Sequence, residues 1–142
     1  MKKKVLLIIA AIFLLVGCSK GKEFSLDIGV TTIDSKLMNM EEIVDSTLTD
    51  AYNLDLSTMK EHVFKQNTDG DFYAIIKTDN TVEVKKQMNN YFERVKDFNS
   101  SYSPERLVIL NDRLEKQLDN YLIYIVAEDA SEIYKQILNE LD

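Results

Sequence analysis

Two short apolar runs, each preceded by residues that tolerate turn geometry, constrain the fold of this chain most strongly. The run Phe72–Lys77 follows the turn-type segment Asn67–Asp71, and the run Tyr121–Ala127 follows Asp119 and Asn120. Apolar runs of about four to eight residues behind such turns are typical of buried strands in β-hairpins. We therefore predict two β-hairpins.

Each buried strand needs a partner on the other side of its turn. The segment His62–Gln66 supplies this partner for the first hairpin. The segment Arg113–Leu118 would also fit a helix by propensity, but we interpret it as the partner strand of the second hairpin. Because Phe72–Ile76 is apolar on both faces, its strand is expected inside the sheet, with the His62 strand at an edge.

Helical periodicity predicts the other main elements. Apolar residues recur at spacings of three and four between Lys36 and Tyr52, which indicates an amphipathic helix. A second, long helix begins at a capping box formed by Asn80 and Glu83. Its apolar stripe comprises Val84, Met88, Tyr91, Phe92, Val95, Phe98 and Tyr102.

Two shorter helices complete the predicted elements. Ser103 and Pro104 supply a cap and a first helical residue for a short helical turn that runs through Leu110. Asp129 with Glu132 predicts a capping box for the last helix. The residues of this helix that are expected to face the core are Ile133, Ile137 and Leu141.

The order helix, hairpin, long helix, hairpin, helix predicts the α+β class, with an antiparallel sheet of two β-hairpins packed against helices. We expect a single α+β domain over residues 36–142. Residues 18–35 show no periodic apolar face, and we interpret them as an N-terminal tether.

The first eighteen residues predict where the chain is delivered. Lys2–Lys4 precede twelve apolar residues, Val5–Val16, as in the basic and apolar regions of a secretory signal peptide. The run is shorter than the ~20 residues that a transmembrane helix needs. Its ending, Leu15–Cys18, resembles the lipobox of bacterial lipoproteins, in which a peptidase cuts before a lipid-modified cysteine. We therefore expect a signal peptide over residues 1–17, lipidation of Cys18, and a lipid anchor on the extracytoplasmic face of the cell membrane.

Charge and cysteine content exclude several classes of partner and site. The chain has 17 basic and 24 acidic side chains, and three of the basic ones lie within residues 1–17, so the remainder has a formal charge of −10. Nucleic acid and anionic lipid headgroups are therefore not expected as partners. Cys18 is the only cysteine, which excludes a disulfide within the chain and thiol catalysis in the domain.

The pattern of elements resembles a family of small lipoproteins of Gram-positive bacteria, classed as a domain of unknown function. The segments that carry the resemblance are Phe72–Lys77 with the long charged helix behind it, Tyr102–Glu105, Gln117–Val126 and Ala127–Asp129. It covers roughly residues 40–141. Family members usually have glycine in the last turn, where this chain has Asp119 and Asn120. The resemblance implies a lipoprotein with this fold, and it brings no known activity or site residues.

Two local motifs indicate candidate chemistry. Asn67–Asp71 resembles the start of an EF-hand calcium loop, but Phe72 stands at the glycine position and Thr78 at the position of the closing glutamate. A hairpin turn explains the same residues, so no metal site is predicted. Ser57 and Lys60 match a serine–lysine motif without its companion elements, and we interpret them as a helix cap and a solvated lysine.

The remaining candidates are a single histidine and two strand tyrosines. His62 is the only histidine, and it is expected on the surface or at a sheet edge. Without a recognisable catalytic or ligand set, we predict no catalytic residues and no cofactor. Tyr73 and Tyr124 alternate away from their strand neighbours, so one sheet face is expected to present aromatic side chains. If that face is uncovered, these two tyrosines are the candidate partner surface.

These observations favour a non-enzymatic, lipid-anchored module that binds another protein or a peptide of the cell envelope. Two alternatives stay open. One is a small envelope hydrolase with two carboxylates about 5 to 9 Å apart, since the many Asp and Glu side chains could supply such a pair. The other is a lipoprotein that binds a solute or an ion, with Asp69 and Asp71 as candidate ligands.

Overall fold

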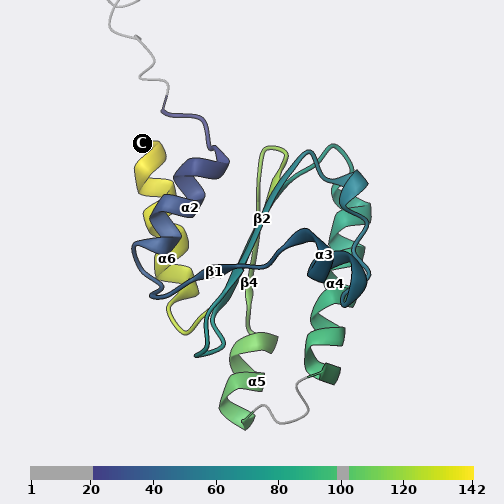
Figure 1. Cartoon of the computed structure of the whole chain (residues 1–142). Coiled ribbons are helices and arrows are strands. Elements are labelled where there is room, and N and C mark those ends of the chain that lie inside the picture. The colour runs from purple at the N-terminus through teal and green to yellow at the C-terminus, as the bar shows by residue number, and fades with distance from the viewer. Residues whose placement is uncertain (1–20, 99–102) are drawn as a thin grey trace, which may run out of the picture.

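The computed structural model describes residues 21–98 and 103–142, which form a sheet covered by helices on both faces (Figure 1). The sheet is antiparallel, in the order β1-β2-β3-β5-β4. Its strands are β1 (Glu41–Glu42), β2 (Glu61–Gln66), β3 (Phe72–Lys77), β4 (Leu114–Leu118) and β5 (Tyr121–Val126). One face is covered by α2 (Leu26–Asp34) and α6 (Ala130–Leu141). The other carries α3 (Asp45–Asp50), the 3-10 helix η1 (Leu56–Thr58), α4 (Thr81–Phe98) and α5 (Pro104–Asn111). The α+β class is confirmed.

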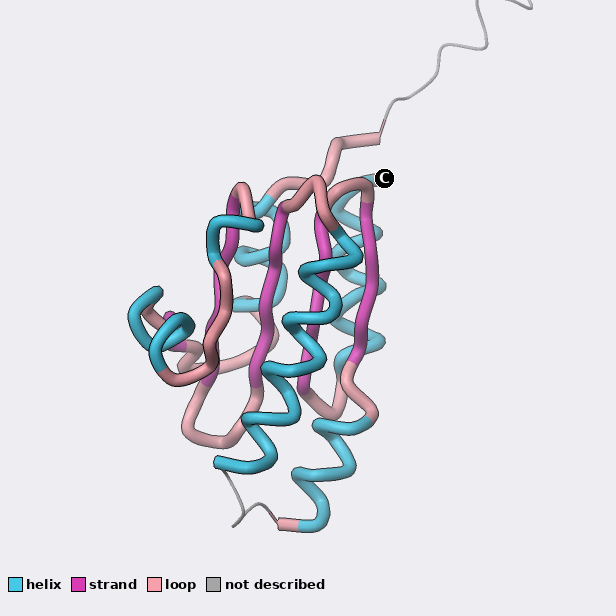
Figure 2. Tube along the Cα trace, turned by 90° about the vertical axis from the view of Figure 1, so that its right-hand side faces the viewer, coloured by secondary structure: helices cyan, strands magenta, loops and turns pink. Residues whose placement is uncertain are grey.

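Both predicted hairpins are present. β2 pairs with β3 around the turn at Asn67–Asp71, and β4 pairs with β5 around Asp119 and Asn120. β3 and β5 lie side by side in the centre of the sheet (Figure 2), and every residue of β3 faces one of β5. All of their side chains except that of Lys77 are buried. Strands of this kind are apolar on both faces because helices cover the sheet on both sides.

The prediction that the His62 strand forms an edge of the sheet is wrong at one end of that strand. The two residues of β1 pair with Lys65 and Gln66 at the end of β2. Next to them, the backbone N–H of Ile43 donates to the carbonyl of Phe64 at 2.8 Å. The first half of β2, including His62, has β3 as its only neighbouring strand in the described chain.

The long helix begins where its capping signal predicts. The side-chain oxygen of Asn80 accepts a hydrogen bond from the Glu83 N–H at 3.2 Å, which confirms the cap. The Asn80 N–H donates to Thr78 Oγ1 at 3.0 Å instead of to Glu83, so the second hydrogen bond of the predicted capping box is not made. The buried stripe of α4 consists of Val84, Met88, Tyr91 and Phe92. Phe98 is 60 % exposed, so the predicted stripe loses contact with the core at the end of the helix. Tyr102, which the prediction also placed in this stripe, lies outside the described residues.

The two shorter predicted helices are present, with a difference at one cap. The Ser103 hydroxyl oxygen accepts a hydrogen bond from the Arg106 N–H at 3.3 Å, and proline begins α5. Asp129 stands at the N-cap of α6, but its side chain makes no capping hydrogen bond, so the predicted capping box with Glu132 is wrong. Its backbone, with φ −100° and ψ 23°, is not in the extended conformation that a side-chain cap needs. The core-facing residues are as predicted: Ile133 and Ile137 are buried and Leu141 is partly buried.

The predicted helix over Lys36–Tyr52 is wrong except near its end. Only Asp45–Asp50 is helical, and Asn39 has a positive φ of 56°, which a right-handed helix does not contain. The segment crosses from one side of the sheet to the other. Leu37 packs in the core beside α2 and α6, whereas Leu48 packs in the core beside α4. The apolar spacing therefore reflects burial on two faces instead of one helical stripe.

The interpretation of residues 18–35 as a tether is wrong for the part that the structure describes. Residues 26–34 form α2, which Ser25 caps through its hydroxyl oxygen. Phe24 and Ile33 are buried in the core that α2 shares with α6 and the sheet. The folded region therefore includes Phe24 and α2, and it does not begin at residue 36.

A hydrogen-bond network joins the end of α2 to the sheet. The Tyr73 hydroxyl donates to one carboxylate oxygen of Asp34 at 2.8 Å, and Lys65 Nζ donates to the other at 2.6 Å. Tyr73 is fully buried. Its burial, followed by the hydrogen bond to Asp34 and the negative charge of that residue, raises the pKa of the Tyr73 phenol above its usual value. The phenol therefore stays protonated and keeps donating.

Replacing Tyr73 by phenylalanine is expected to lower the free energy of unfolding by about 1.5–3 kcal/mol, because the lost hydrogen bond is made to a charged group. Urea denaturation measures the change. The matched control is Tyr134→Phe on α6, whose hydroxyl has no hydrogen bond to the described residues and whose loss should cost less than about 0.5 kcal/mol. A loss in Tyr73→Phe no larger than in the control would contradict the role of this network.

Candidate functional site

The two strand tyrosines do not form a partner surface. Tyr73 is fully buried on the face covered by α2, and Tyr124 is 2 % exposed on the face covered by α4. Because Tyr73 pairs with Ile125, the neighbouring Tyr124 points to the opposite face of the sheet. Helices cover both faces, so the predicted bare aromatic face is not present and these residues are corrected to core positions.

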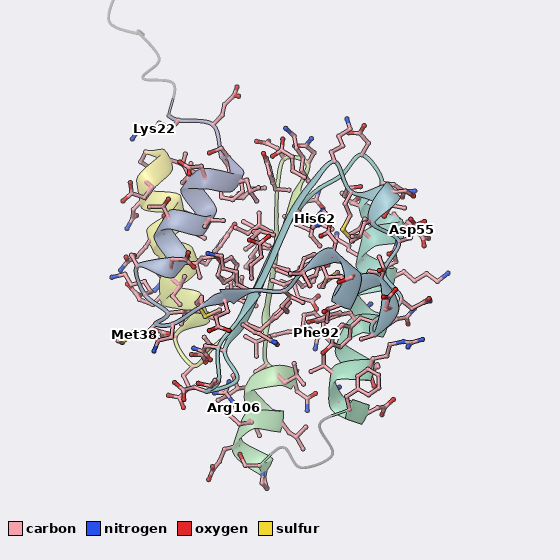
Figure 3. The ribbon with its side chains drawn as sticks, viewed as in Figure 1. Lys22, Met38, Asp55, His62, Phe92 and Arg106 are labelled. Carbon is pink, nitrogen blue, oxygen red and sulfur yellow. The ribbon has the colours of Figure 1, made fainter. Side chains whose placement is uncertain are left out.

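A groove of about 910 Å³ lies at the end of the sheet where β2 turns into β3. One wall is α4, with Tyr91, Phe92 and Val95, and another is the start of α5, with Ser103 and Arg106. Figure 3 labels Phe92 and Arg106 on these two helices. The floor and rim include Phe72, Val126, Tyr52, Asn39, Glu41 and the turn at residues 67–71. The lining that is open to solvent is mostly polar, with buried apolar side chains behind it, and the volume lies within the usual range of ligand sites, about 300–1,000 Å³.

The turn on the rim of the groove is organised by Asn67. Its side-chain oxygen accepts hydrogen bonds from the N–H groups of Asp69 and Asp71, at 3.0 and 2.9 Å. Its amide nitrogen donates to the carbonyl of Met38 at 3.1 Å, which joins the turn to the loop after α2. Gly70 has a φ of 90°, a conformation that favours glycine. The hairpin interpretation of this segment is confirmed.

Arg106 connects α5 to this turn. Its Nη2 donates to a carboxylate oxygen of Asp71 at 3.3 Å. The guanidinium also lies against Gly70, where a Cβ would be only 2.9 Å from Nη2. The Nε atom is buried and has no hydrogen-bond partner among the described residues. A buried donor without an acceptor costs about 1–3 kcal/mol, which lowers the net stability that the contact between Arg106 and the turn contributes.

Two exposed carboxylates stand on the rim of the groove. Glu41 in β1 and Asp69 in the turn both line it, and neither forms an ion pair with a basic residue within residues 21–98 and 103–142. The third acid, Asp71, is balanced by Arg106. The rim is therefore negative, and the half-buried side chains of Tyr52 and Val95 belong to the same lining. This combination favours a ligand that carries basic and apolar groups together.

The serine–lysine motif and the histidine make local contacts away from this groove. The Ser57 hydroxyl donates to the Asp55 carboxylate, and Lys60 forms an exposed ion pair of its own. Ser57 and Lys60 are thus engaged separately. The interpretation of Ser57 as a helix cap is wrong, because Asp55 is the N-cap of η1 and Ser57 lies inside this helix. Lys60 is exposed, as predicted. His62 lies on β2, with its Nε2 atom 2.8 Å from a carboxylate oxygen of Asp45.

Within residues 21–98 and 103–142, no group of three or more His, Cys, Asp or Glu side chains could hold a metal ion. None of the helices described there is both long and apolar enough to cross a membrane. Cys18, the predicted lipidation site, lies outside the described residues, and its modification stays a prediction.

The sequence matches a known protein family over most of the folded region. A family model described as a domain of unknown function, DUF4358, matches residues 33–127. The chain belongs to this family. The part matched to DUF4358 contains the five strands of the sheet, α4 and α5, whereas α6 lies beyond it and α2 overlaps it only at its end. No curated protein and no solved structure shows a significant match.

The groove of this DUF4358 domain has no single marker in the sequence. Its parts are visible separately: the turn at Asn67–Asp71 as a hairpin signal, and Tyr91 and Phe92 as members of a helical stripe. Arg106 belongs to no motif, and only the packing of α5 beside the turn gives it a role. The usable signal is Gly70, since glycine in a turn allows the close approach that Arg106 makes.

Proposed function

We propose that this DUF4358 protein is a lipid-anchored, extracytoplasmic and non-enzymatic module that binds a segment of another envelope protein or a peptide in the groove between α4 and α5. The uncompensated rim carboxylates Glu41 and Asp69, with the half-buried side chains of Tyr52 and Val95 in the same lining, carry this proposal. Half-buried apolar side chains supply contact area, and exposed carboxylates attract basic side chains. The expected ligand is therefore a peptide segment with both apolar and basic residues.

The first eighteen residues support the anchor. A basic start, the apolar run Val5–Val16 and Cys18 after Gly17 fit export followed by lipidation. Two acyl chains are sufficient for stable attachment, whereas a single chain binds membranes only marginally. A lipid-anchored domain would meet its partners at the membrane surface, where a binding module of this size has access to other envelope proteins.

The polar groups of the groove fit binding better than hydrolysis. Its lining, as far as the structure describes it, has no histidine or cysteine, and the Ser103 oxygen caps α5. Hydrolysis by a carboxylate pair needs two acids that face the substrate from either side. Asp71 is engaged by Arg106 and Asn67, so Glu41 and Asp69 are the two acids of the lining that such a mechanism would have to use, and both are exposed on the rim instead of being buried in the groove.

Removing the rim charges is expected to weaken capture of the partner. A photo-cross-linking residue at Thr68, which is exposed on the rim, should give a discrete adduct when the full chain is expressed in its cells. Combining Glu41→Gln with Asp69→Asn should reduce the adduct yield about threefold to tenfold, because two surface charge interactions are lost. The adduct is quantified by gel electrophoresis and identified by mass spectrometry.

The matched control removes the same number of negative charges, two, from α6. Glu132→Gln with Glu140→Gln leaves the groove unchanged, and its adduct yield should equal that of the parent chain. A cross-linker at Lys135, also exposed on α6, should give no such adduct. An equal loss in both double variants, or the same adduct from Thr68 and Lys135, would count against the groove as the binding site.

A further inference from the structure

The beginning of the described chain is fastened to the end of α6. The Lys22 N–H donates to the carbonyl of Leu141 at 2.8 Å. Gly21 approaches the same carbonyl so closely that a Cβ there would overlap its oxygen. Phe24 is buried, and its ring lies edge-on to that of Tyr121 with 4.9 Å between the centroids. These contacts fix the point at which the chain enters the domain.

The lipidation site lies very close to this point in the sequence. Only Ser19, Lys20 and Gly21 separate Cys18 from Lys22. Four Cα–Cα steps of about 3.8 Å span at most about 15 Å, whatever conformation these residues adopt. A lipid on Cys18 would therefore hold the end of the domain at which α2 begins and α6 ends close to the headgroups.

The groove lies at the other end of the sheet. Lys22 and Arg106 stand at opposite ends of the molecule in Figure 3. Figures 1 and 2 likewise place the C-terminus at one end and α5 at the other. Strands β2 and β3, with six residues each, run between these ends and span about 20 Å at about 3.3 Å per residue.

We infer that the end of the domain where α2 begins and α6 ends faces the membrane and that the groove opens away from the bilayer, an inference that rests on the proposed lipid attachment at Cys18. The ligand is then a soluble or wall-side segment of an envelope protein, and not a lipid or a membrane-embedded helix. The short connection sets this orientation, and charge does not, because the exposed acids Glu23, Asp27, Glu140 and Asp142 outnumber Lys20 and Lys22 at the attached end.

Two fluorophore positions on the lipidated full chain test this orientation. Because Cys18 carries the lipid and is the only cysteine, Thr68→Cys and Glu140→Cys each introduce one free thiol at an exposed position. The labelled chains are placed in vesicles of phosphatidylcholine and phosphatidylglycerol that carry a nitroxide on the headgroup. The fluorophore at position 140 is expected to lose most of its emission, and the fluorophore at position 68 to keep most of it.

Flotation of the vesicles tests the lipid attachment separately. The full chain should float with them and the Cys18→Ala variant should not, and failure of the full chain to float would refute the proposed anchor. If the chain floats but quenching is equal at both positions, or stronger at position 68, the proposed orientation is wrong while the lipid anchor stands.

A Gly-Ser linker of about 20 residues inserted after Lys20 adds a reach of about 25 Å and should reduce quenching at position 140. Unchanged quenching would show that the short connection does not set the orientation.

Discussion

A chain that begins at residue 36 is expected to unfold, or to lose a large part of its stability, relative to one that begins at residue 21. The deletion removes Phe24 and Ile33, each of which contributes about 1.5–3 kcal/mol when buried. It also uncovers Tyr73 and Ile75, which are fully buried. The loss from the two deleted side chains alone, about 3–6 kcal/mol, is comparable with the total stability of a small domain, about 5–15 kcal/mol.

Circular dichroism and urea denaturation of residues 21–142 and 36–142 measure this loss. A synthetic peptide of residues 21–35 provides the matched control, because it can restore the missing helix to the shorter chain. A peptide of the same composition in scrambled order should not. If the shorter chain unfolded at the same urea concentration as the longer one, α2 would not belong to the cooperative unit.

The central strands could be predicted because their signals are local. Phe72–Ile76 and Tyr121–Val126 are continuous apolar runs behind turn residues, and burial on both faces requires that composition. The Asn80 cap is equally local, since it acts within one helical turn. Local signals do not fix the register between strands. The prediction placed Tyr73 and Tyr124 on one face, and the pairing of β3 with β5 puts them on opposite faces.

Helix α2 shows why another part of the fold could not be predicted. The prediction found no periodic apolar face in residues 18–35, although Leu26, Val30 and Ile33 recur at helical spacing. The pattern is weak because it is short and because Gly29 and two neighbouring threonines lower the helix propensity of the segment. Tertiary packing supplies the missing stability. Gly29 allows α2 to approach the sheet so closely that a Cβ there would lie 2.5 Å from Cδ1 of Ile75. A contact of this kind depends on a strand far along the chain and leaves no periodic pattern.

The candidate site was unpredictable for a related reason. A single arginine has no spacing to recognise, and Arg106 gains its role only when α5 packs beside the β2–β3 turn. Glu41 is similar, because its place on the rim follows from the pairing of β1 with β2. Both residues lie in segments whose neighbours are set by tertiary contacts, whereas the aromatic wall follows from the helical stripe of α4.

Phe92→Ala is expected to lower the free energy of unfolding by about 3–5 kcal/mol, the usual cost of truncating a buried phenylalanine. Phe92 is 1 % exposed. Its ring centroid lies 5.7, 5.3 and 5.8 Å from those of Phe72, Tyr91 and Tyr124. The guanidinium carbon of Arg113 lies 4.1 Å from the same centroid. Because these neighbours belong to two strands, the helix and the segment before β4, the cavity cannot close without moving several elements.

Phe98→Ala is the matched control, since it makes the same change on the same helix at a position that is 60 % exposed. Its ring meets that of Tyr52 edge-on at 5.8 Å, so a smaller loss of about 0.5–1.5 kcal/mol is expected. Urea denaturation of both variants measures the two losses of stability, and equal losses would contradict the central position of Phe92 in the core.

Phe92→Leu keeps most of the side-chain volume and should lower the free energy of unfolding by less than about 1.5–2 kcal/mol. Because Phe92 also lines the groove, this milder variant can separate a loss of partner binding from a loss of folding.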